Sequence, residues 1–100
     1  SEPAPPPARL ADETRAVTEV RAAMRAGNTA EALRLLDAYH AEFPSGVLEE
    51  EARILHIETL AMAGNRAEAA RRAKRFLVER PSSHYAPRVR ALETSLSTPE

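Results

Sequence analysis

Apolar residues fall at helical spacing along most of the chain. The first stripe comprises Leu10, Ala16, Val17, Val20, Ala23 and Met24. Residues with this spacing share one face of an amphipathic helix. Gly27 follows the stripe directly, and a glycine just past the last periodic residue is typical of a helix end. A helix is therefore predicted from about residue 10 to this glycine.

A second helix is predicted from Asn28 to the sequence Pro44-Ser45-Gly46. Asn28 is a favoured helix cap, and Glu31 follows three residues later, close to the pattern of a capping box. The apolar face of this helix comprises Ala32, Leu33, Leu35, Leu36, Tyr39 and Phe43.

The remaining apolar positions predict three more helices. One begins near Val47, carries three glutamates in its first turns, where carboxylates are favoured, and ends at Gly64. The next is capped by Asn65 and ends before Pro81. Ser83 is predicted to cap the last helix, which tolerates Pro87 in its first turn.

Composition agrees with an all-α fold. Nearly half of the hydrophobic residues, which make up 43% of the chain, are alanine, and only 4% of residues are aromatic. Alanine is the best helix former, so closely packed helices are expected rather than a core of large side chains. We expect a Pro-rich linker at residues 1–9, one helical domain at 10–97 and a tail at 98–100.

The heptapeptide AGNTAEA at residues 26–32 returns as AGNRAEA at residues 63–69, an interval of 37. The same interval relates Arg34 to Arg71, Glu42 to Glu79, Pro44 to Pro81 and Leu55 to Leu92. A fixed period with two helices per unit indicates a helical solenoid, in which hairpins stack because one hairpin cannot bury its apolar face alone.

These residues resemble the tetratricopeptide repeat family. Gly27, Ala32 and Pro44 match its spacing of turn glycine, small residue and helix-ending proline, and Gly64, Ala69 and Pro81 match it again. The period of 37 exceeds the family's usual value of about 34. The resemblance implies two hairpins and a C-terminal capping helix that together act as a protein–protein interaction module.

In this family the first helix of each pair lines a concave surface that contacts peptides. By register, the resemblance assigns that role to Val17, Arg21, Met24, Ile54, Glu58, Ala61, Arg88, Ala91 and Ser95. An exposed apolar side chain at Val17, Met24 or Ile54 is equally consistent with a homodimer or a regulatory oligomerisation domain. The lysine and asparagine set that clamps terminal carboxylates in some members is missing.

The basic residues Arg71, Lys74 and Arg75 are expected on the outer face of the fourth helix. They offer an alternative site for an acidic partner, although a solvated face explains them as well. The net charge of −1, and the lack of aromatic residues among the basic ones, argue against nucleic acid.

No motif for catalysis, for a cofactor or for metal binding is present. Cysteine is absent, and His40, His56 and His84 have neither zinc-site spacing nor an adjacent acid in a metalloprotease motif. We therefore expect no enzyme activity, and interpret the histidines as surface or partly buried helix residues.

The segment PSSHYAPRV, residues 81–89, resembles the joining segment of repeats in bacterial envelope proteins. This resemblance implies the exported portion of a membrane-anchored protein, with the anchor outside these residues. It favours the periplasm or cell envelope over the cytoplasm.

Overall fold

The computed structural model describes residues 7–97, which form five helices joined by short turns. The helices are α1 (Pro7–Arg25), α2 (Thr29–Glu42), α3 (Glu49–Met62), α4 (Arg66–Glu79) and α5 (Ala86–Ser97). No strand occurs in this range. The predicted all-α class is confirmed: α1 with α2, and α3 with α4, form two antiparallel hairpins that α5 follows.

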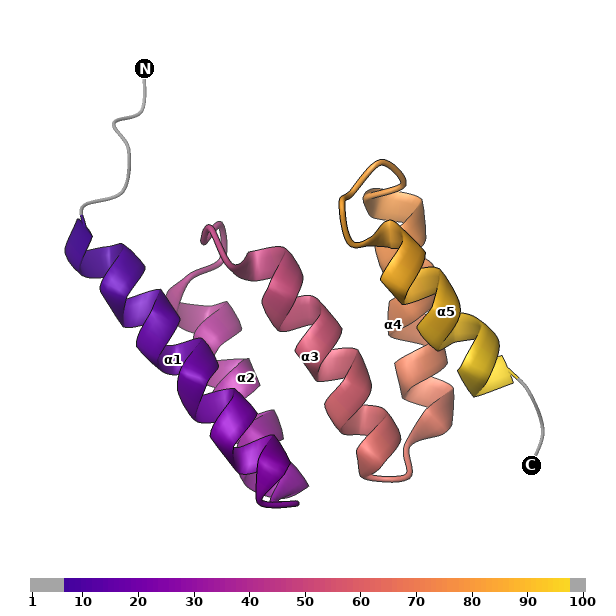
Figure 1. Ribbon diagram of the computed structural model, residues 1–100, viewed down its shortest axis with the longest axis horizontal. Helices are drawn as coiled ribbons and strands as arrows, with labels where there is room; N and C mark the ends of the chain where they lie inside the picture. The colour runs from indigo at the N-terminus through magenta and orange to yellow at the C-terminus, as the bar shows by residue number, and fades with distance from the viewer. Residues whose placement is uncertain (1–6, 98–100) are drawn as a thin grey trace.

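The helices form two layers, as Figure 1 shows. α1, α3 and α5 run across the side nearer the viewer, with α2 behind α1 and α4 behind α5. α3 contacts each of the other four helices, whereas no Cα atoms of α2 and α4 come within 8 Å of each other. The stack measures 17 Å along its shortest axis, the thickness of two packed helices.

Three predicted boundaries can be compared with the structure. α1 begins at Pro7, inside the segment predicted as a linker, because proline is well tolerated in the first helical turn. α3 begins at Glu49, two residues after the predicted start near Val47. Ser83 lies three residues before α5, where its hydroxyl accepts a hydrogen bond from the Tyr85 amide. Residues 1–6 and 98–100, which complete the predicted linker and tail, lie outside the described range.

The two turns within the hairpins have the same backbone conformation. Gly27 has a φ of 74° and Gly64 a φ of 87°, both in the left-handed region. In each turn the next residue's amide donates to the carbonyl five residues earlier, from Asn28 to Ala23 and from Asn65 to Leu60, both at 2.9 Å. The asparagine side chains then cap the following helices, each accepting from the amide three residues on. The 37-residue period therefore repeats a turn as well as a sequence.

The core consists of two apolar clusters that share α3. The first cluster comprises Val17, Val20, Leu36, Tyr39, Phe43, Ala52 and Leu55. The second comprises Ile54, Ile57, Leu60, Ala69, Ala73, Phe76 and Val89. Because neighbouring positions on α3 enter different clusters, this helix is covered on nearly all sides and joins the two hairpins into one interior.

The outer face of α5 differs from the corresponding face of α3. Ile54, Ile57 and Leu60 of α3 are buried against α4 and α5. The residues 37 positions later, Ala91, Thr94 and Ser97, are small or polar and are exposed. α5 thus completes the second cluster with its inner face and presents a polar outer face, as capping elements of repeat proteins do.

Replacement of Gly64 by alanine should lower the free energy of unfolding by about 1–2 kcal/mol, because a Cβ atom disfavours the left-handed conformation. Chemical denaturation measures this loss. Gly64→Asn is the control, and it should cost less because asparagine adopts this conformation more readily. Equal stability of Gly64→Ala and the wild type would contradict the assignment of the turn.

Candidate interaction site

The nine positions implied by the resemblance lie on α1, α3 and α5, but two of them are not on the surface. Val17 is 5% exposed and Ile54 only 1%, so the expectation that they are exposed is wrong. α1 is covered by α2 and α3, and α3 is covered in the same way by α4 and α5. This leaves a narrower accessible stripe than register alone predicts.

Three of the remaining positions meet at one pocket between α1 and α3. Arg21, Met24 and Glu58 line it together with Arg25 and Leu55, two residues outside the predicted set, and its volume is about 150 Å³. Ala61 is partly buried and packs against the second cluster. Arg88, Ala91 and Ser95 are exposed on α5 but do not line this pocket.

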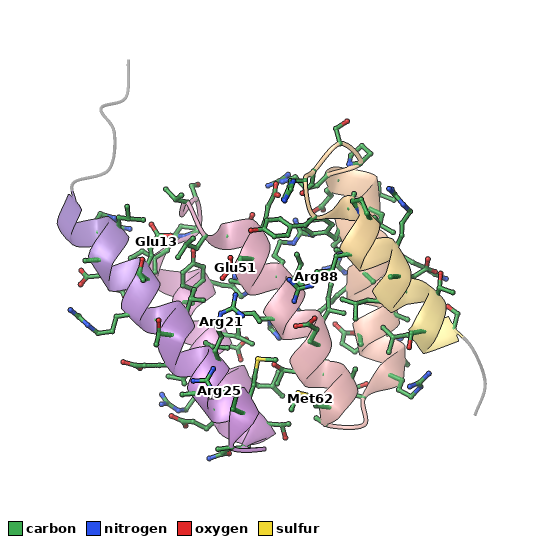
Figure 2. All side chains as sticks on the ribbon, in the orientation of Figure 1. Glu13, Arg21, Arg25, Glu51, Met62 and Arg88 are labelled. Atoms are coloured by element: carbon green, nitrogen blue, oxygen red, sulfur yellow. The ribbon has the colours of Figure 1, made fainter. Side chains whose placement is uncertain are left out.

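Ion pairs link the three front helices. The Arg21 guanidinium of α1 bonds the Glu51 carboxylate of α3, and Figure 2 shows both side chains between these helices. The Arg88 guanidinium of α5 bonds the Glu58 carboxylate of α3 at 2.9 Å. Glu58 lies 37 residues after Arg21, and Arg88 lies 37 residues after Glu51. The same two repeat positions therefore pair twice, with their charges exchanged.

A buried carboxylate holds the loop between α2 and α3 against α1. Glu13 is 1% exposed and accepts hydrogen bonds from the Tyr39 hydroxyl at 2.8 Å and the Leu48 amide at 3.2 Å. Burial, followed by the hydrogen bond to Glu13, raises the pKa of Tyr39. Glu13 is not among the residues that the sequence predicts for a site. The repeat was the available signal, because Glu50, 37 residues later, likewise accepts from a loop residue, the Ser83 hydroxyl, at 2.6 Å.

Two histidines come together across helices. The His40 and His56 rings stack with centroids 5.5 Å apart, and His40 Nε2 lies 3.4 Å from His56 Nδ1. Arg72 Nη1 of α4 also lies 3.4 Å from His56 Nδ1. Arginine can only donate, so His56 Nδ1 is the acceptor and His40 Nε2 carries a proton. His84 is exposed, and no three potential metal ligands gather anywhere in residues 7–97.

The electrostatic environment keeps His56 neutral. Burial lowers the pKa of His56 to about 4, and the neighbouring Arg72 and His40 act in the same direction. Burial likewise lowers the pKa of His40. Both imidazoles are therefore neutral near pH 7, and they serve as packed, hydrogen-bonded parts of the boundary between the hairpins.

The alternative basic face lies where the sequence predicts it. Arg71, Lys74 and Arg75 are exposed on α4, while Ala69, Ala73 and Phe76 turn inward. Arg71 pairs with Glu68 at 2.8 Å. Arg75 reaches the rim of a larger groove between α2 and α4.

Comparison of the chain with models of known families, with curated proteins and with solved structures finds no match in any of the three. The fold itself defines the class as a stack of antiparallel helical hairpins. Among the described residues, no helix is both long enough and apolar enough to cross a lipid bilayer.

Replacement of Glu13 by alanine should cost about 2–3 kcal/mol of stability, because the buried Tyr39 hydroxyl loses its acceptor. Glu13→Gln keeps an acceptor and should cost less. A double-mutant cycle with Tyr39→Phe, followed by denaturant titration, tests the contact. Additive effects of the two substitutions would show that these side chains do not interact.

Stability should fall in mild acid because of His56. Its pKa is 6.5 in the unfolded chain and about 4 in the folded protein, so between these values only the unfolded state binds the proton. The free energy of unfolding should fall by about 2 kcal/mol more between about pH 7 and pH 5 than it does in a His56→Gln variant. Urea titrations of both proteins measure the difference, and parallel pH profiles would refute the prediction.

Proposed function

We propose that this chain is a protein–protein interaction module, a tetratricopeptide-like scaffold or adaptor that binds a segment of a partner on the face of α1, α3 and α5. The observation that carries the proposal is the pocket between α1 and α3. Three of the positions selected by family register, Arg21, Met24 and Glu58, meet there.

The pocket combines the two kinds of contact that peptide recognition requires. Met24 and Leu55 provide apolar walls, and a volume of about 150 Å³ suits one aliphatic side chain of a partner. Arg25 is exposed, and within the described part of the chain it forms no ion pair, so its guanidinium is available to a carboxylate. A partner segment with an acidic residue beside an aliphatic one is the expected ligand.

The ion pairs support a pre-formed binding face. Arg21–Glu51 and Glu58–Arg88 connect α1 to α3 and α3 to α5. Partly exposed ion pairs contribute little stability, but these two favour one lateral arrangement of the neighbouring helices. A face held in register loses less conformational entropy when it binds a partner.

In this proposal the chain binds its partner and catalyses no reaction. The Glu13 carboxylate is buried and already accepts two hydrogen bonds from the protein, so its role is to hold the fold. For location, we propose the bacterial periplasm or cell envelope, supported by the resemblance of residues 81–89 to repeats in envelope proteins.

A peptide-display selection on the immobilised protein tests the function. Peptides that combine an acidic and an aliphatic residue should be enriched, and Arg25→Glu should weaken their binding at least about tenfold, measured by isothermal titration. Arg90→Glu is the matched control, since it makes the same charge change at an exposed position of α5 away from the pocket. It should leave binding within about twofold.

Two results would count against the peptide-binding proposal. Equal loss of binding in Arg25→Glu and Arg90→Glu would mean that charge alone drives capture. A stable dimer by sedimentation, dissociated by Arg25→Glu, would instead identify a self-association surface on the same helices.

A further inference from the structure

A second, larger groove lies on the opposite side of the stack. Because no Cα atoms of α2 and α4 come within 8 Å of each other, α3 forms the floor between them, and the groove has a volume of about 340 Å³. Its lining includes His40 from α2, Arg53 and Ile57 from α3, and Arg72 and Arg75 from α4. None of the residues that line the pocket between α1 and α3 lines this groove.

The two carboxylates of the groove already have partners within the protein. Glu79 bonds the Arg53 guanidinium at 3.0 Å, and Glu49 approaches the same side chain at 3.8 Å. Arg53 also lies over the Phe76 ring, 5.0 Å from its centroid. These contacts fix Arg53 in the floor, and Glu49 also pairs with Arg80 at 3.6 Å, so both carboxylates have a cationic partner.

The groups of the groove that remain available to a ligand are hydrogen-bond donors, and most of them carry positive charge. Arg75 is exposed and, within the described range, forms no ion pair. Arg72 uses its Nε atom to bond Glu68 at 3.0 Å and is only partly buried, and the His40 ring faces it from α2. Three guanidiniums against two carboxylates leave the lining with a net positive charge before any imidazole is protonated.

We propose that the groove between α2 and α4 binds an anion of the phosphate class, held by Arg72 and Arg75 and by a protonated His40. The donors come from helices on opposite walls, and Arg53 lies in the floor between them. A tetrahedral anion directs its oxygens to several sides at once, whereas a carboxylate directs two oxygens within one plane. Arginine guanidiniums are also well suited to bind such oxygens in pairs.

Binding should be coupled to the protonation of His40. An anion beside the ring favours the imidazolium form, and the His40 Nε2–H can still donate to His56 when the ring is charged. The charged and titratable groups around the two rings are Asp37 on α2, Glu49 and Arg53 on α3, and Glu68 and Arg72 on α4. The anion adds negative charge to this set, so its affinity should rise as the pH falls.

Sulfate is the appropriate first probe, because it stays a dianion across the relevant pH range. Titration into the isotopically labelled protein, followed by NMR, should shift the Arg72, Arg75 and His40 resonances. Arg75→Gln should weaken the binding of sulfate at least about tenfold. The affinity of the wild-type protein for sulfate should rise at least about threefold from about pH 8 to about pH 6. In His40→Gln this pH dependence should disappear.

Arg71→Gln is the matched control, because it removes the same charge from the same helix outside the groove. Equal weakening in Arg71→Gln and Arg75→Gln would overturn the proposal, as would sulfate shifts centred on α1 or α5, or an affinity independent of pH. Inorganic phosphate and a phosphoserine peptide then distinguish a free ligand from a modified partner. Equal binding of the unphosphorylated peptide would exclude the phosphate class.

Discussion

The packing of α3 against all four other helices is the interaction on which the rest of the structure depends. Seven of its fourteen residues are buried, and five of these seven belong to the two apolar clusters. Fully burying an isoleucine or leucine side chain contributes about 1.5–3 kcal/mol, so the shared helix supplies much of what a chain of this size needs to fold. Without it, the α1–α2 hairpin and the α4–α5 pair would each expose an apolar side.

Because α3 serves both hairpins, its polar residues set how the neighbouring helices are arranged. Glu51 reaches back to Arg21, whereas Glu58 reaches forward to Arg88. Both acids of these two pairs are on α3, and α1 and α5 each contribute one arginine to them. The middle helix is thus linked by ion pairs to the helices on both sides of it.

Local patterns explain why the sequence predicted the helices and turns well. Gly27, Gly64, Asn28 and Asn65 act through their own backbone and adjacent residues, and the structure shows the turns and caps expected of them. The site was harder to predict, because exposure depends on neighbours distant in the chain. Register alone cannot show that Val17 and Ile54 are covered by other helices. The contact between His40 and His56 depends on the distance between α2 and α3, which no short-range spacing encodes.

The polar outer face of α5 has a consequence for lengthening the array. A third hairpin stacked there would meet Ala91, Thr94 and Ser97 where α4 and α5 meet Ile54, Ile57 and Leu60 on α3. The new interface would lack three large aliphatic side chains, and it would therefore lose several kcal/mol of stabilisation from apolar burial. An engineered longer version should therefore duplicate the α3–α4 unit internally and keep α5 as the last helix, so that every new junction inherits an aliphatic surface.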